Sequence, residues 1–94
     1  MKIAILLYPG FTSLDAIGPY EMLVHAPGVE MMLVAKEKVL LTGEKDVFKI
    51  MPSHCFDDVT SADILLIPGG QGETAAATDE ATINWVKTIH ATTT

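Results

Sequence analysis

The chain has 94 residues, of which 49% are hydrophobic, and it carries a formal net charge of −6. This apolar content excludes a disordered chain, and the length is sufficient for one small folded domain. Because nucleic acid and anionic membrane surfaces both require clustered Lys and Arg, we expect neither as a direct partner of this segment.

The first third of the chain predicts a strand, a helix and a second strand. Residues 3–8 form an apolar run without alternation, typical of a strand covered on both faces of a parallel sheet. The run has no small-residue cleavage site and is too short to span a membrane, so it is not a signal peptide. A helix is expected over residues 12–25, between two Pro-Gly pairs, and a second strand over residues 29–35.

The remainder predicts a hairpin, a strand and a helix. Residues 39–41 and 47–51 flank a polar loop of the length usual in hairpins. Residues 64–67 form a wholly apolar strand that ends at a Pro-Gly-Gly turn. A helix is expected over residues 79–90, with Thr78 as its cap.

Buried strands that alternate with helices predict an α/β fold with a parallel sheet. A sheet that ended at residues 64–67 would leave a strongly apolar strand as an unprotected edge. The tail at residues 91–94 becomes β-branched where the next parallel strand is expected, near Thr92. We therefore expect residues 1–94 to form a single, partial domain, the N-terminal half of a larger fold.

Two glycines, Gly69 and Gly70, follow the strand expected at residues 64–67. In open α/β sheets, ligands bind outside the carboxyl ends of the strands, near the point where the strand order reverses. Glycines at that position allow close approach of the backbone and can direct N–H groups at a developing oxyanion. The alternative is a plain loop that requires positive φ angles.

Asp15 is the second candidate. With Thr12 it matches a capping box, in which the acid bonds back to the N–H of the cap residue. Pro19 cannot donate to the carbonyl of Asp15, so we expect the helix to kink or restart near Gly18. A partly buried carboxylate at such a break, at the same sheet end as Gly69, is a candidate for proton transfer. The sequence pattern leaves both roles open.

Cys55 is the single cysteine, which excludes an internal disulfide and favours a reducing compartment, so the expected location is cytoplasmic. Its neighbour His54 points to the opposite side of an extended segment, so no catalytic dyad is expected. No strand-to-helix turn is expected around the thiol, which we interpret as inert. The scattered histidines predict no metal site, and no nucleotide-binding motif is present.

Three segments together resemble the ThiJ/PfpI superfamily: KIAILLYPGF at 2–11, LDxxGPYE at 14–21 and DxLxIPGG at 63–70. Within it, an aspartate followed by x-x-Gly-Pro resembles the isonitrile hydratase branch and the related regulators that carry an AraC-type DNA-binding domain. The resemblance implies a flavodoxin-like, class I glutamine amidotransferase-like domain that forms homodimers. It also implies a lyase that needs no cofactor and hydrates isonitriles to N-substituted formamides.

By position, the resemblance makes Asp15 the catalytic acid and places Gly69 and Gly70 in the oxyanion-binding or substrate-binding loop. The family's nucleophilic cysteine would follow a strand beginning near Thr92, and Cys55 does not align with it. We therefore expect this segment to be inactive alone. The alternatives are the ligand-sensing half of an AraC-type regulator and a self-associating module.

Overall fold

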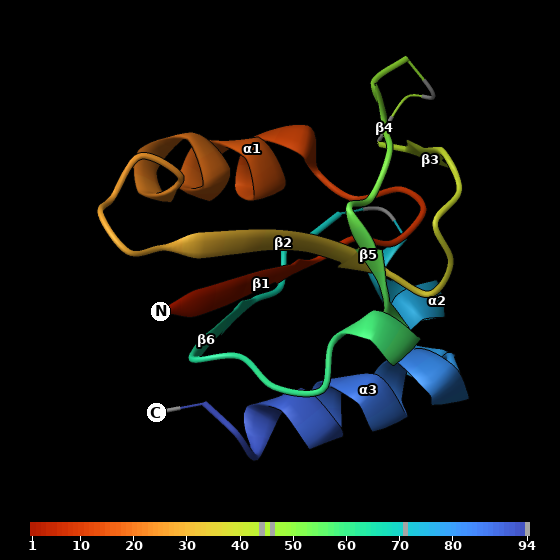
Figure 1. Cartoon of the computed structure of the whole chain (residues 1–94). Helices are drawn as coiled ribbons and strands as arrows, with labels where there is room; N and C mark the ends of the chain where they lie inside the picture. The colour runs from red at the N-terminus through yellow and green to blue at the C-terminus, as the bar shows by residue number, and fades with distance from the viewer. Residues whose placement is uncertain (44, 46, 71, 94) are drawn as a thin grey trace.

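In this computed structural model, the described residues are 1–43, 45, 47–70 and 72–93. They form a four-stranded sheet of order β5-β2-β1-β6, in which every pair is parallel. The sheet strands are β1 (Lys2–Leu6), β2 (Glu30–Ala35), β5 (His54–Cys55) and β6 (Ile64–Leu66). Helix α1 (Ser13–Leu23) covers one face, and α2 (Glu73–Thr78) and α3 (Glu80–His90) lie on the other (Figure 1). The expected parallel α/β fold is confirmed.

Strand β1 forms the centre of the core. Its residues Ile3, Ala4, Ile5 and Leu6 are at most 2% exposed, because β2 and β6 flank the strand and helices cover both faces. Burial of each large apolar side chain stabilises the fold by about 1.5–3 kcal/mol. The uninterrupted apolar run is thus explained by a strand that is buried on both sides.

Helix α1 continues through Pro19 as one helix, so the expected restart near Gly18 is wrong. Proline removes one hydrogen bond, to the carbonyl of Asp15, but packing on both sides of it offsets the loss. Ala16 is fully buried before the proline, and Tyr20 packs against the core after it.

The predicted hairpin is confirmed in shorter form as the antiparallel pair β3 (Leu41–Thr42) and β4 (Lys49–Ile50). It lies beside the start of α1, where the Phe48 ring meets the Phe11 ring edge to face at 6.3 Å between centroids. The N–H of Gly10 donates to the carbonyl of Thr42 at 2.8 Å, which fixes the hairpin at the carboxyl end of β1.

Three short elements lie where none was predicted: β5, a 3-10 turn over Phe56–Asp58, and α2. Helix α3 begins at Glu80, and its cap is Asp79, whose side chain accepts from the N–H of Thr82 at 3.0 Å. The expectation that Thr78 caps this helix is therefore wrong, because Thr78 is the last residue of α2.

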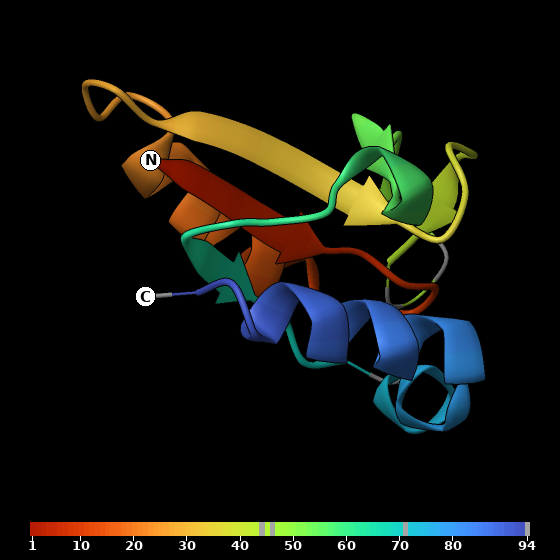
Figure 2. The same ribbon diagram turned by 60° about the horizontal axis from the view of Figure 1, so that its bottom comes forward.

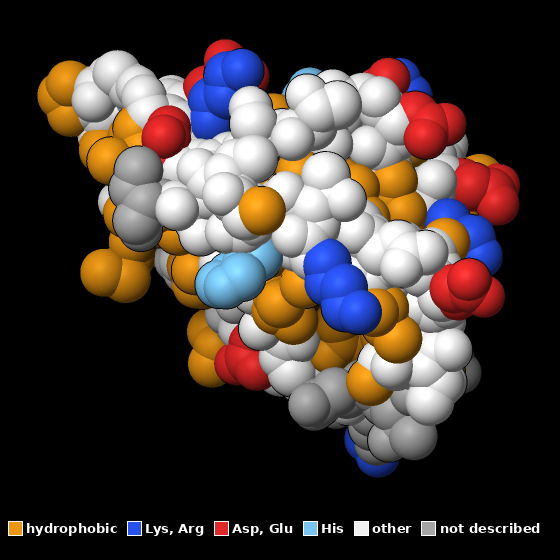
Figure 3. Space-filling view, turned by 90° about the horizontal axis from the view of Figure 1, so that it is seen from below, with side chains coloured by type: hydrophobic (Ala, Val, Ile, Leu, Met, Phe, Trp, Pro, Cys, Tyr) orange, Lys and Arg blue, Asp and Glu red, His pale blue; other side chains and the backbone are white. Residues whose placement is uncertain are grey.

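Strand β6 is an edge strand, as expected. Its three residues are only partly buried, and the following Ile67 is 55% exposed. The space-filling view of the face that carries α3 shows hydrophobic side chains exposed beside lysine and histidine side chains (Figure 3). The strand expected near Thr92 is not observed up to Thr93, because the Thr92 hydroxyl instead bonds to both backbone groups of Ala62 in a turn. No helix within the described ranges has both the length and the apolar character needed to cross a membrane.

Candidate functional site

The sheet topology brings two loops together. Strand β1 has β2 on one side and β6 on the other, so the strand order reverses between β1 and β6. In open α/β sheets, the crevice at the carboxyl ends of two such strands is where ligands bind. The loop at residues 7–12 follows β1, and the loop that follows β6 includes residues 67–70 and 72 (Figure 2).

These two loops are joined by backbone hydrogen bonds. The N–H of Thr12 donates to the carbonyl of Gly69 at 2.7 Å, and the N–H of Gly72 donates to the carbonyl of Gly10 at 3.3 Å. The Tyr8 hydroxyl adds a buried hydrogen bond to the carbonyl of Pro68. The position of the glycine turn relative to α1 is therefore fixed by the main chain.

Gly70 is required by this close approach. Its φ of +153° is rarely adopted by residues with a side chain, and a Cβ there would lie 2.7 Å from the Phe11 Cα and collide with the Gly10 carbonyl oxygen. A Cβ at Gly72 would collide with the carbonyl of Pro9. The plain-loop interpretation therefore explains why Gly70 is glycine, since its neighbour is the other loop.

Asp15 meets the glycine turn. Its Oδ2 accepts from the N–H of Gly69 at 3.2 Å, across 54 positions of the sequence. The capping box is not formed, because the Thr12 side chain makes no cap hydrogen bond and the Thr12 N–H is used by Gly69. The expected partial burial is also wrong: the Asp15 side chain is exposed. The carboxylate is therefore positioned by a main-chain donor, with open access from solvent.

Two backbone donors in the turn differ in availability. The Gly69 N–H is occupied by Asp15, whereas the Gly70 N–H donates to no described residue. The two glycines therefore differ: the N–H of Gly69 holds the acid, and the N–H of Gly70 has no acceptor among the described residues.

Cys55 lies away from this site. It ends β5, with β2 and β1 between it and β6, or about 14 Å at the usual spacing of strands. Its Sγ donates to Asp58 Oδ2 at 3.2 Å, and the His54 ring pairs instead with the Ser53 hydroxyl at 2.7 Å. Cys55 precedes a 3-10 turn, but its φ of −103° is ordinary extended backbone and not the strained turn of a nucleophile elbow.

The carboxyl group of Asp58 is held ionised by this contact. The backbone N–H of Cys55 and then the thiol donate to it, and they lower the Asp58 pKa with a smaller contribution from Lys38. Among the described residues, no three His, Cys, Asp or Glu side chains are grouped as ligands for a metal ion.

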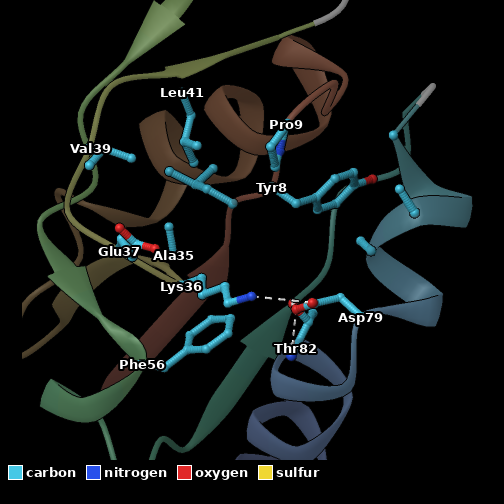
Figure 4. A pocket seen from close by; sticks show the side chains of 14 residues that line it. Tyr8, Pro9, Ala35, Lys36, Glu37, Val39, Leu41, Phe56, Asp79 and Thr82 are labelled. Carbon is cyan, nitrogen blue, oxygen red and sulfur yellow. Dashed lines mark hydrogen bonds and ion pairs between the residues drawn. The ribbon is translucent and has the colours of Figure 1, made fainter.

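A separate cavity of about 390 Å³ lies on the α2 side of the sheet end, and it includes neither Asp15 nor the glycine pair (Figure 4). Lys36 Nζ pairs with Asp79 Oδ1 at 3.3 Å inside it. The Thr82 hydroxyl, and then the Thr82 N–H, donate to Asp79 and lower its pKa. Sequence reasoning missed this cavity, because no motif links these three residues.

The parallel sheet defines an open α/β domain, and a carboxylate and a glycine turn meet where its strand order reverses, which makes this the candidate site. All 94 residues match the DJ-1/PfpI family, and the chain belongs to that family.

Its known relatives extend the comparison. The chain is 32% identical over 87 residues to isonitrile hydratase from Pseudomonas putida, covering 93% of this chain and 38% of that protein. A ThiJ/PfpI family protein from Pseudomonas syringae superposes with a TM-score of 0.92 at 32% identity, covering 98% of this chain and 38% of that one. DJ-1 from Toxoplasma gondii shares the fold, with a TM-score of 0.78 at 19% identity, covering 93% and 48% of the two chains. The chain thus spans less than half the length of each of these relatives.

Proposed function

We propose that this chain supplies the acid and the glycine turn of an isonitrile hydratase-like site. The observation that carries the proposal is the hydrogen bond between Asp15 Oδ2 and the Gly69 N–H. Support comes from the 32% identity to the Pseudomonas putida isonitrile hydratase and from the position of both groups where the strand order reverses.

In the proposed reaction, a thiolate supplied by another part of the complete protein attacks the isonitrile carbon and forms a C–S bond. Asp15, when protonated, delivers a proton to that carbon, which gives a thioimidate. Water then adds to the same carbon, and expulsion of the thiol leaves an N-substituted formamide. The atoms balance as isonitrile plus water, and no oxidant or reductant is needed.

The structure suggests a role for each group of this chain. The Gly69 N–H orients the Asp15 carboxylate toward the open sheet end, as general acid–base catalysis requires. The free Gly70 N–H is a donor for the substrate or for the polarised carbon–nitrogen bond. The place of Cys55 on the opposite edge of the sheet supports a nucleophile from another part of the complete protein.

A chimera tests this proposal. The 94 residues would replace the matching segment of the Pseudomonas putida isonitrile hydratase, and formamide production from an alkyl isonitrile would be followed. Asp15→Asn should lower kcat by at least about 100-fold, the usual scale of a lost general acid or base. Asp57→Asn, an exposed acid on the 3-10 turn, is the matched control and should leave the rate unchanged.

The stability of the two variants separates chemistry from folding. Because Asp15 is exposed and accepts one described hydrogen bond, Asp15→Asn should change the free energy of unfolding by less than about 1 kcal/mol. An Asp15→Asn chimera that keeps full activity would contradict the proposal. So would formamide production by the 94-residue chain alone that survives Cys55→Ala.

The expected homodimer and the regulator alternative stay predictions. The regulator alternative requires a helix-turn-helix module encoded with this domain, and light scattering would measure the state of association. Isonitrile turnover by the chimera would favour the enzyme.

A further inference from the structure

The cavity beside α2 has the size and position of a ligand site. Its volume of about 390 Å³ falls in the range of small-molecule pockets, and it opens at the carboxyl ends of β1 and β2. Its walls come from the segments that follow β1, β2 and β5, together with α2 and α3. None of the proposed catalytic groups lines it, although Tyr8, Pro9 and Gly72 of the two joined loops do, so the cavity is a second site beside the first.

The walls are mainly apolar. Tyr8, Leu41 and Phe56 form much of the lining, and Figure 4 shows the Phe56 ring beside Lys36. The Phe56 ring is stacked on Trp85 with 4.9 Å between centroids and an angle of 9°, and the Trp85 indole donates to the carbonyl of Val59 at 3.0 Å. This wall is therefore held in place before any ligand arrives.

The described lining of the cavity has more acidic than basic side chains. Lys36 is paired with Asp79, whose second oxygen accepts from both donors of Thr82, so the charges of this pair offset each other. The carboxylate of Glu37 makes no hydrogen bond or ion pair with a described residue. The charged side chains that are described in the lining therefore sum to −1, from one Lys and two acids.

We propose that this cavity binds a small organic cation, a primary amine with a short apolar tail. The tail would lie against Tyr8, Leu41 and Phe56, and the ammonium group would pair with Glu37 at the rim. An anion would instead have to compete with Asp79 for Lys36.

Three probes with the same tail test the charge preference: hexylamine, hexanol and hexanoate. Each would be titrated into the 94-residue chain at neutral pH, with amide chemical shifts followed by NMR. Hexylamine should bind most tightly, and it should shift the amides of Lys36, Glu37 and Ala76 and not those of Asp15 and Gly69. Hexanol or hexanoate binding as tightly as hexylamine would overturn the proposal, as would no saturable binding of hexylamine.

Two pairs of variants localise the site. Glu37→Gln should weaken the binding of hexylamine about two- to fivefold, which is the effect of losing a solvent-exposed charge pair. The affinity for hexanol should stay unchanged. Glu30→Gln, at the far end of β2, is the control and should change neither. Equal weakening by both variants would show a net-charge effect and overturn the assignment to Glu37.

The second pair of variants tests whether filling the cavity prevents binding. Val39 lines it and is 49% exposed, so Val39→Trp should remove hexylamine binding by occupying the space. Val47→Trp, at an 83% exposed hairpin position outside the cavity, should bind like the wild type. Binding that survives Val39→Trp unchanged would place the amine elsewhere and overturn the proposal.

Discussion

The loops that leave β1 and β6 are joined backbone to backbone, whereas the cavity beside α2 is walled by side chains. At the first site, the main-chain N–H of Thr12 donates to Gly69 and that of Gly72 donates to Gly10, and the glycines allow this contact. At the second, Phe56, Lys36 and Asp79 meet from separate segments. Geometry at the first site thus depends on the absence of side chains, and at the second on which side chains are present.

The largest expected effect is on the joined loops. Gly70→Ala should lower the free energy of unfolding by about 2–4 kcal/mol, the combined order of a backbone clash and an unfavourable φ. Gly28→Ala is the matched control: its φ is +74°, but an added Cβ meets nothing within 4 Å, so the loss should be only about 1–2 kcal/mol. Chemical denaturation measures both, and equal losses would show that the loops can separate without cost.

A smaller effect is expected at the side-chain wall. Phe56→Ala removes a partly buried ring and its stack on Trp85, and should cost about 1–3 kcal/mol. Phe48→Ala, which removes an edge contact at a 40% exposed position, should cost about 1 kcal/mol or less. If Phe48→Ala lowered the thermal unfolding temperature more than Phe56→Ala, the stack of Phe56 on Trp85 would not hold the cavity wall in place.

The smallest expected effect is on the dependence of folding stability on pH in the acid range. The bonds from Thr82 hold the Asp79 pKa below its ordinary value of 3.8, so the unfolded chain binds more protons than the folded chain near that pH. The stability contributed by Asp79 is therefore fully present above about pH 4 and is lost as the pH falls through the lowered folded pKa. Asp79→Asn should flatten the dependence of stability on pH in that acid range, and Asp57→Asn should not. Parallel acid profiles for Asp79→Asn and the wild type would contradict the role given to Thr82.

The contrast between the sites also explains how far the sequence predicted this molecule. Buried apolar runs predicted β1, β2 and β6, because a strand covered on both faces must be apolar along its whole length. The approach of Asp15 to Gly69 was predictable for a related reason: parallel strands end at the same edge, and both residues follow such strands.

The unpredicted parts depend on contacts between distant segments. Strand β5 has two residues, too few to show a periodicity, and it forms by pairing with β2. The capping box of Thr12 and Asp15 was a sound local pattern, but Gly69 offers the carboxylate a different donor that no short motif reveals. The cavity beside α2 could not be predicted, because its lining joins five segments whose packing the sequence does not show.

The single N–H of Gly69 has a thermodynamic consequence. One amide hydrogen serves one strong acceptor at a time, and in this structure the acceptor is Asp15. A ligand that accepted the hydrogen bond of the Gly69 N–H would displace the Asp15 carboxylate from it. Ligand binding at the turn and the breaking of the Asp15–Gly69 hydrogen bond would therefore be linked equilibria. Each would shift the other by the same factor, as reciprocal coupling between two binding events requires.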